Sequence, residues 1–262
     1  MNSCGLSSPG EPTLSPALAF EGAIDAAMVD LDGTLVDTLG DFVAALNGML
    51  ADLALPPVSR DVVALRVGKG SEHLIRSVFN YIVASALIES VAIKNLATGL
   101  LSDSDDGAFF QAAFASYQRH YDAVNGHHAQ VYPGVMEGLQ GMQRAGLKLA
   151  CLTNKPVAFA RSLLSSKGLD GYFSQVFGGD SFARKKPDPL PLLKTCEALG
   201  TLPARTLMIG DSSNDALAAR AAGCPVVLVT YGYNHGEPVR ALDADGFVDS
   251  LASWSQLAKC LL

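Results

Sequence analysis

Two aspartates one residue apart, Asp30 and Asp32, follow a short apolar run at residues 24–29. Such a run is typical of a buried strand, and Gly33 indicates a turn at its carboxyl end. Open α/β sheets keep their ligands at the carboxyl ends of their strands. Two carboxylates held this close repel each other unless a cation or a shared proton intervenes. The pair therefore predicts a site for a hard metal ion, with a polar loop capping a core strand as the alternative.

Three later groups of polar residues also stand at a strand end or a helix start. They are Thr153 with Asn154, Lys186, and Asp211 with Asp215. A hydroxyl and an amide suit phosphate oxygens, although both also cap helices. Acids at helix starts are favoured by capping and the macrodipole, and a single lysine is usually just solvated. Each group has a structural explanation alone, but four in this order favour one shared chemical site.

In this order the four motifs resemble those of the haloacid dehalogenase-type phosphohydrolases. That family has an hhhhDxDGT motif, a strand ending in Thr or Ser, a lysine and a GDxxxD-type acidic motif. The resemblance spans residues 24 to about 250. Four short segments are similar to the bacterial phosphoglycolate phosphatases: residues 67–71, 132–135, 152–156 and 231–234.

The order of apolar runs predicts an α/β fold with a doubly wound parallel sheet. We expect strands near residues 24–29, 147–152, 174–178, 206–210, 225–229 and 246–249. We expect helices near residues 134–145, 156–167, 188–199, 214–222 and 252–261. The resemblance implies that this is a Rossmann-like haloacid dehalogenase core.

Between residues 41 and 125 the apolar residues recur with helical spacing and no strand is evident. By resemblance this insert is a small all-α cap domain placed after the first strand. The expected division is a disordered tail at 1–20, the core at 21–40 and 126–262, and the cap at 41–125. Linkers are expected near residues 38–42 and 125–132, a packed helix at 81–93 and a solvated loop at 99–107.

The resemblance implies a Mg²⁺-dependent phosphatase in which Asp30 is the nucleophile and forms an aspartyl-phosphate. The ion would be held by Asp30, the backbone carbonyl of Asp32, and Asp211. Asp215 would support the waters of the ion, or would serve only as an acid at a helix start. The side chain of Asp32 would act as general acid and then as general base.

The same resemblance assigns phosphoryl-oxygen contacts to the Thr153 hydroxyl, the Asn154 backbone N–H and Lys186. Gly33 joins the substrate-binding residues because its turn aims both aspartates into one crevice. Lys69, between Gly68 and Gly70, is the candidate for pairing with a substrate carboxylate, or is a solvated lysine on a flexible loop. Lys155 is a further candidate phosphate contact.

Composition limits the partners of the chain. Its 262 residues carry a net charge of −7 without a Lys/Arg cluster, which argues against nucleic acid and anionic membranes. No apolar run approaches the ~20 residues of a membrane span. Five widely spaced cysteines form neither a disulfide framework nor a zinc pattern, so we expect a cytoplasmic protein. A monomer or a homodimer is expected.

The predicted reaction is hydrolysis of a small anionic phosphate monoester, with 2-phosphoglycolate as the leading substrate. Another small phosphometabolite, or a phosphosugar mutase reaction, is the alternative within the family. A dehalogenase is disfavoured because Asp32 is present. A non-catalytic phosphate-binding regulator is disfavoured as well, because binding alone would not require both Asp30 and Asp32.

Overall fold

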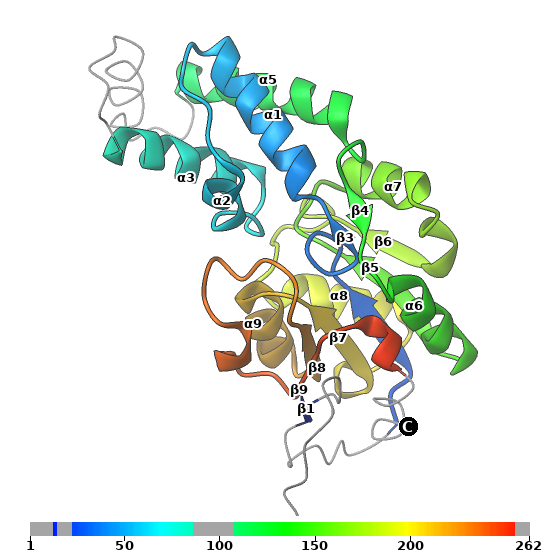
Figure 1. Ribbon diagram of the computed structural model, residues 1–262. Coiled ribbons are helices and arrows are strands. Elements are labelled where there is room, and N and C mark those ends of the chain that lie inside the picture. Colours follow the sequence, from blue (N-terminus) through cyan, green and yellow to red (C-terminus); the bar gives the residue numbers. More distant parts are fainter. Residues whose placement is uncertain (1–12, 15–22, 86–106, 255–262) are drawn as a thin grey trace, which may run out of the picture.

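The chain folds into a sheet-containing core and a helical part that lies above one edge of the sheet (Figure 1). This computed structural model describes residues 13–14, 23–85 and 107–254. The core strands are β2 (Ala26–Val29), β5 (Lys148–Leu152), β6 (Gln175–Phe177), β7 (Thr206–Gly210), β8 (Val226–Val229) and β9 (Gly246–Val248). Each lies within one of the six expected runs.

The sheet has the order β1-β9-β8-β7-β2-β5-β6. The six core strands are parallel, and the two-residue strand β1 (Thr13–Leu14) pairs antiparallel with β9. Strand β2 is central, with β5 on one side and β7 on the other. From β2 the chain adds β5 and β6 on one side and then crosses to add β7, β8 and β9 on the other, and such a switch point opens a crevice at the strand ends.

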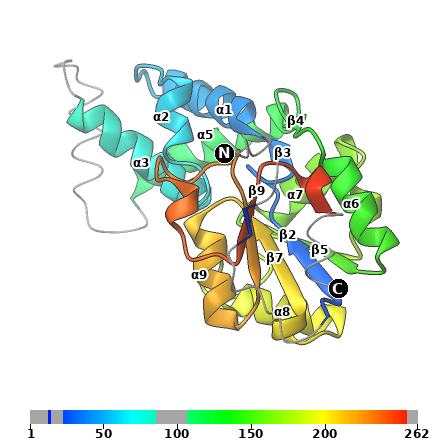
Figure 2. The ribbon, with the colours of Figure 1, turned by 60° about the horizontal axis from the view of Figure 1, so that its bottom comes forward.

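Successive side chains of the strands enter two separate cores, because strand residues alternate between the faces of a sheet. On one face, Ala27 and Val29 of β2 pack with helices α6 (Val135–Arg144) and α7 (Val157–Ser166). On the other, Ala26 and Met28 pack with α8 (Leu190–Leu199) and α9 (Ser213–Ala222). Figure 2 shows the two helix layers on opposite sides of the sheet. The predicted fold class is therefore confirmed.

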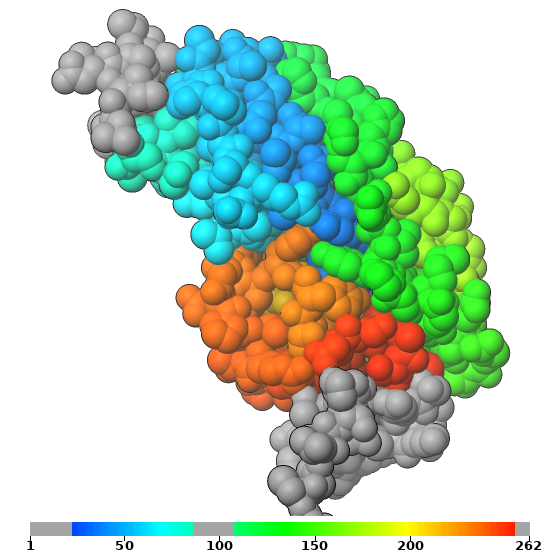
Figure 3. Space-filling model, viewed as in Figure 1, coloured from blue at the N-terminus to red at the C-terminus, as the bar shows by residue number. Residues whose placement is uncertain are grey.

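The helical part contains α1 (Leu39–Asp52), α2 (Arg60–Ala64), α3 (Ser71–Ala84) and α5 (Ala108–Val124). It has its own apolar core, which includes Leu46, Phe79 and Tyr117. Figure 3 shows this cap in contact with the segment that follows β8. The first residues of the helix expected at 81–93 form the last turn of α3. Residues 86–106, which include most of the expected loop at 99–107, lie outside the described residues.

The two connections between core and cap form a short ribbon of paired strands, β3 (Val36–Asp37) and β4 (Gln130–Val131). The linker expected at residues 38–42 is wrong, because α1 already begins at Leu39. The Asp37 carboxylate accepts a hydrogen bond from the Leu39 N–H at 3.1 Å, which satisfies one of the free N–H groups at the start of the helix. The helix therefore begins earlier in the chain than the apolar pattern indicates.

Two other differences lie at the ends of the chain. Strand β1 falls within the expected disordered tail, and the remainder of residues 1–22 lies outside the described part, so the tail stays a prediction. At the end of the core, the helix expected at 252–261 begins as a 3₁₀ turn at Leu251–Ser253, and residues 255–262 are not described. No described helix combines the length and the apolarity that crossing a membrane requires.

Candidate active site

Asp30 and Asp32 leave the carboxyl end of β2 at the switch point of the sheet. The Asp30 N–H still donates to Ile209 of β7 at 2.9 Å, so the chain remains in strand geometry at the first aspartate. At Gly33 the backbone turns with a φ of +85°, a conformation that favours glycine. This turn brings Asp211, at the end of β7, against the glycine.

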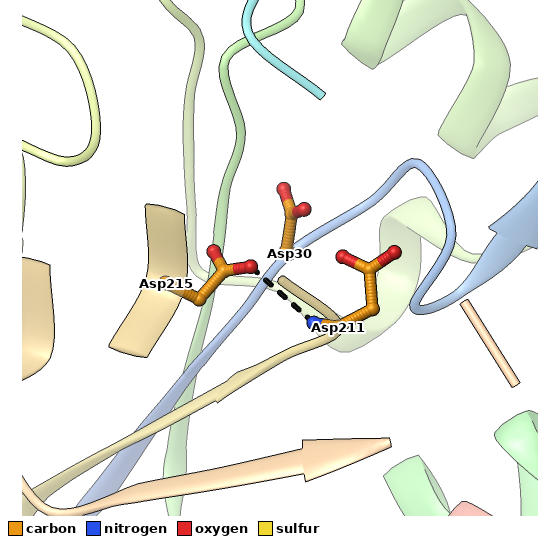
Figure 4. A group of neighbouring side chains, drawn as sticks. All are labelled: Asp30, Asp211 and Asp215. Carbon is orange, nitrogen blue, oxygen red and sulfur yellow. Dashed lines mark hydrogen bonds between the residues drawn. The ribbon is translucent and has the colours of Figure 1, made fainter. Parts of the chain in front are cut away.

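Three buried carboxylates gather at this edge: Asp30, Asp211 and Asp215 (Figure 4). One oxygen of each lies within 4.8 Å of the others. Burial raises the pKa of Asp30 to about 7. Burial, together with the neighbouring Asp215 and Asp30, also raises the pKa of Asp211 well above its usual range. The cluster thus resists full ionisation in the absence of a nearby cation.

Lys186 lies directly within this cluster. Its Nζ lies 3.0 Å from Asp30 Oδ1, 2.7 Å from Asp215 Oδ1 and 2.8 Å from the Leu152 carbonyl oxygen. Although burial opposes its charge, the two carboxylates raise the pKa of Lys186 above its usual range. One lysine faces three carboxylates, and Asp30 Oδ1 has no partner in hydrogen-bond geometry within the described residues. The cluster can therefore hold a metal ion.

Asp215 is bound closely by the protein itself. Its Oδ2 accepts from the Ser212 N–H at 3.2 Å, the Ser212 hydroxyl at 2.9 Å and the Asp211 N–H at 3.3 Å. With Ser212 it forms a capping box at the start of α9. Its Oδ1 accepts a hydrogen bond from Lys186. Asp215 therefore holds both the turn at Asp211 and Ser212 and the Lys186 ammonium in position.

Asp32 pairs with Lys155, a contact that sequence reasoning missed. Lys155 Nζ lies 2.9 Å from Asp32 Oδ1, and the two side chains are only 2% and 11% exposed. The ammonium also donates to the Tyr121 hydroxyl on cap helix α5. The single signal in the sequence was the place of Lys155 directly after Thr153 and Asn154. Tyr121 follows Tyr117 at a helical spacing, which is typical of an ordinary buried residue of a helix.

A pocket between core and cap joins these groups. Among its lining residues are Asp30, Asp32, Thr153, Asn154, Lys155, Lys186 and Asp215 from the core and Phe42, Gly68, Leu74 and Tyr121 from the cap. Asp211 and Gly33 stand beside it, in contact with each other. Lys69 is exposed and is not among the lining residues, so its contact with a substrate stays a prediction.

Gly33→Ala should disrupt the site selectively. A Cβ at Gly33 would lie 2.0 Å from Asp211 Oδ2, so the carboxylate must move. We expect both a loss of roughly 1 kcal/mol or more in unfolding free energy from the positive φ and a fall in catalytic activity of at least about tenfold. Urea denaturation and steady-state kinetics check the two effects.

Gly146→Ala is the matched control, because Gly146 has a φ of +81° and nothing within 4 Å of its Cβ position. It should lose similar stability and keep its activity. Equal activity in the two variants would show that catalysis does not require Asp211 to stay in its present position.

Comparison with known proteins defines the class to which this fold and site belong. The haloacid dehalogenase-like hydrolase family model matches residues 24–223. The chain belongs to the haloacid dehalogenase-like hydrolases, as the motifs indicated.

Several relatives are similar over almost their entire length. A phosphoglycolate phosphatase of Thiobacillus denitrificans is 43% identical over 234 residues, which cover 89% of this chain and 95% of that protein. A phosphoglycolate phosphatase of Cupriavidus necator is 43% identical, covering 86% of this chain and 89% of that protein. The crystal structure of a predicted phosphoglycolate phosphatase from Haemophilus somnus is 31% identical with a TM-score of 0.79, covering 90% of this chain and 99% of that one.

Proposed function

We propose that the protein is a Mg²⁺-dependent phosphatase that hydrolyses 2-phosphoglycolate to glycolate and phosphate. The observation that carries this proposal is the buried group of Asp30, Asp211, Asp215 and Lys186 at the sheet's switch point. The substrate follows from the relatives, which are named phosphoglycolate phosphatases at 43% identity.

Asp30 is the proposed nucleophile. It is the carboxylate at the end of the central strand, it lines the pocket, and Oδ1 lacks a partner in hydrogen-bond geometry within the described residues. Attack by a carboxylate oxygen on phosphorus forms an aspartyl-phosphate and expels an alkoxide, and water then cleaves the new bond. Nearby positive charge is required, because an anionic nucleophile must approach an anionic phosphoryl group.

The proposed metal ligands are Asp30, the backbone carbonyl of Asp32, and Asp211. Carboxylate and carbonyl oxygens are the ligands that Mg²⁺ prefers. When bound, the ion supplies charge neutralisation at the phosphoryl oxygens. Asp215 is proposed to act indirectly, since its two oxygens already accept bonds from Lys186, Ser212 and the Asp211 N–H.

Asp32 is proposed as the general acid for the leaving alkoxide and then as the general base for water. The Thr153 hydroxyl, the Asn154 N–H and Lys186 are proposed to bind the phosphoryl oxygens. All four residues line the same pocket, which supports their acting on one substrate. Lys186 is already fixed by two carboxylates, so it needs little reorganisation as charge develops.

The test is a substrate panel measured with Mg²⁺ and after EDTA treatment. We expect 2-phosphoglycolate to have the highest kcat/KM among small phosphate esters, and EDTA to remove activity that added Mg²⁺ restores. A higher kcat/KM for another ester would identify that ester as the preferred substrate and contradict the assignment of 2-phosphoglycolate. Activity that survives exhaustive chelation would contradict the metal assignment.

The described cysteines, Cys151, Cys196 and Cys224, are free thiols, which supports the proposed cytoplasmic location. A monomer or homodimer also stays a prediction.

A further inference from the structure

Lys155 and Lys186 both line the pocket, and they differ in the partners of their ammonium groups. An ammonium group has three N–H donors. Lys186 donates to Asp215 and to the Leu152 carbonyl, and it also lies 3.0 Å from Asp30 Oδ1, so its ammonium group is held among the acidic residues of the core. Among the described residues, Lys155 has two hydrogen-bond partners, Asp32 and the Tyr121 hydroxyl. Lys155 therefore keeps one donor for a ligand.

The surroundings of Lys155 favour a second anion. The side chain is 2% exposed, and its Nζ lies 4.8 Å from the ring centre of Phe42 and 4.7 Å from that of Tyr121. Phe159 packs edge-on against Tyr121 at 5.1 Å. A charge removed from water requires pairing and complete hydrogen bonding. Aromatic faces attract the ammonium but carry no net charge. Asp32 is its carboxylate partner among the described residues, and one buried N–H donor is left for an acceptor.

We propose that Lys155 binds the carboxylate of the substrate and so selects phosphate esters whose carboxylate lies one methylene from the bridging oxygen. This inference rests on the proposed function, and it names the residue that would recognise the carboxylate of the leaving group. Asp32 is the proposed acid for the bridging oxygen, and Lys155 Nζ is 2.9 Å from Asp32. A carboxylate two covalent bonds from that oxygen therefore arrives beside the ammonium.

The Gly68-Lys69-Gly70 turn contacts the core through its main chain. The Gly68 carbonyl accepts hydrogen bonds from the side chains of Asn154 and Asn214, both at 3.2 Å. These bonds attach the cap to the core through the main chain. Lys69 itself is exposed. The turn thus closes one side of the pocket, while a buried cation at Lys155 discriminates between ligands more strongly than an exposed one.

The cap contributes to this selection through Tyr121. Its hydroxyl holds the Lys155 ammonium from helix α5, whereas Lys155 and Asp32 both belong to the core. Tyr121→Phe keeps the ring and removes the hydroxyl. It should weaken selection for the carboxylate in the same direction as loss of Lys155, by a smaller factor.

The kinetic test compares 2-phosphoglycolate with ethyl phosphate, which has a methyl group in place of the carboxylate. In Lys155→Met the ratio of the two kcat/KM values should fall by about ten- to hundredfold, the range for a charge-assisted hydrogen bond. The ratio does not depend on how much of the variant is folded. Lys69→Met is assayed in parallel, because the competing assignment is that Lys69 binds the substrate carboxylate.

The second readout is binding without turnover. In 3-phosphonopropionate a methylene replaces the bridging oxygen of 2-phosphoglycolate, so the compound keeps the spacing of the two anionic groups and cannot be cleaved there; propylphosphonate has a methyl group in place of its carboxylate. Competitive inhibition constants against p-nitrophenyl phosphate should show that the wild type prefers 3-phosphonopropionate and that Lys155→Met loses this preference.

The outcomes separate this inference from the proposed function. Loss of selectivity in Lys155→Met for phosphonates, with poor wild-type turnover of 2-phosphoglycolate, supports the inference and rejects the proposed substrate. Equal losses on both substrates in Lys155→Met, or selective loss in Lys69→Met alone, overturns the inference and leaves the proposed function standing. A wild type without any preference for the carboxylate overturns both.

Discussion

Asp30→Asn is expected to reduce turnover of 2-phosphoglycolate by at least about 10⁴-fold, the scale on which enzymes lose activity without their nucleophile. An amide has no anionic oxygen to attack phosphorus, and Asp30 is the carboxylate that directly follows the central strand and lines the pocket. Folding should be unaffected or slightly improved, because burial raises the pKa of Asp30 to about 7 and thus already disfavours its charge. Steady-state kinetics and urea denaturation measure the two quantities.

Asp25→Asn is the matched control. Asp25 lies just before the other end of β2, where its carboxylate pairs with Arg205 at 2.6 Å near the surface. The same change of charge there should leave turnover within about twofold, because surface charges act weakly over distance. Comparable losses in the two variants would mean that the effect reflects net charge or stability and would remove Asp30 from the nucleophile role.

Lys186→Met should lower both stability and activity. Removing one partner of a buried ion pair leaves the carboxylates of Asp30 and Asp215 uncompensated, at a cost of about 3–5 kcal/mol. Loss of a preorganised donor to the phosphoryl oxygens should lower kcat by about 10²–10³-fold. Urea denaturation measures the stability, and kinetics at saturating Mg²⁺ measures kcat.

The stability deficit of Lys186→Met should depend on pH in a defined direction. Lys186 lowers the pKa of Asp30, so its loss should raise that pKa further above its ordinary value. The folded variant then binds a proton that the unfolded chain releases, so stability falls as pH rises between the unfolded-state and the folded-state pKa of Asp30. In the wild type this fall ends near pH 7, whereas in the variant it continues above that pH. The deficit should therefore be smaller at pH 5 than at pH 8.

Lys185→Met is the control for this variant, because Lys185 is the exposed neighbour of Lys186 in the chain. It should remain within about 0.5 kcal/mol of the wild type, as surface substitutions usually do. A Lys186→Met deficit of similar size, or one that grows toward acidic pH, would contradict the proposed burial of a charged cluster.

The parallel sheet could be predicted because strands buried on both faces appear as continuous apolar runs. The shorter elements could not. Strands β1, β3 and β4 have two residues each, too few for any periodicity to be visible. At the start of α1 the Leu39 N–H donates to the Asp37 carboxylate and to the Tyr233 hydroxyl, contacts that an apolar pattern does not reveal.

The motif aspartates and Lys186 could be placed near one another because parallel strands present their carboxyl ends at one edge. The Lys155–Tyr121 contact could not be predicted, because it joins a core loop to a cap helix and depends on how the two parts meet. Tyr121 also packs in the apolar core of the cap. Its hydroxyl contact becomes visible only in three dimensions.

The central claim is that the phosphoryl group passes through the Asp30 carboxylate. Wild-type enzyme mixed with 2-phosphoglycolate and Mg²⁺, quenched in acid within milliseconds and digested, should yield a phosphorylated peptide. Fragmentation by mass spectrometry should place the phosphoryl group on Asp30, and Asp30→Asn should give none. A phosphoryl group on Asp32, Asp211 or another residue, or turnover without any phosphorylated intermediate, would contradict the account.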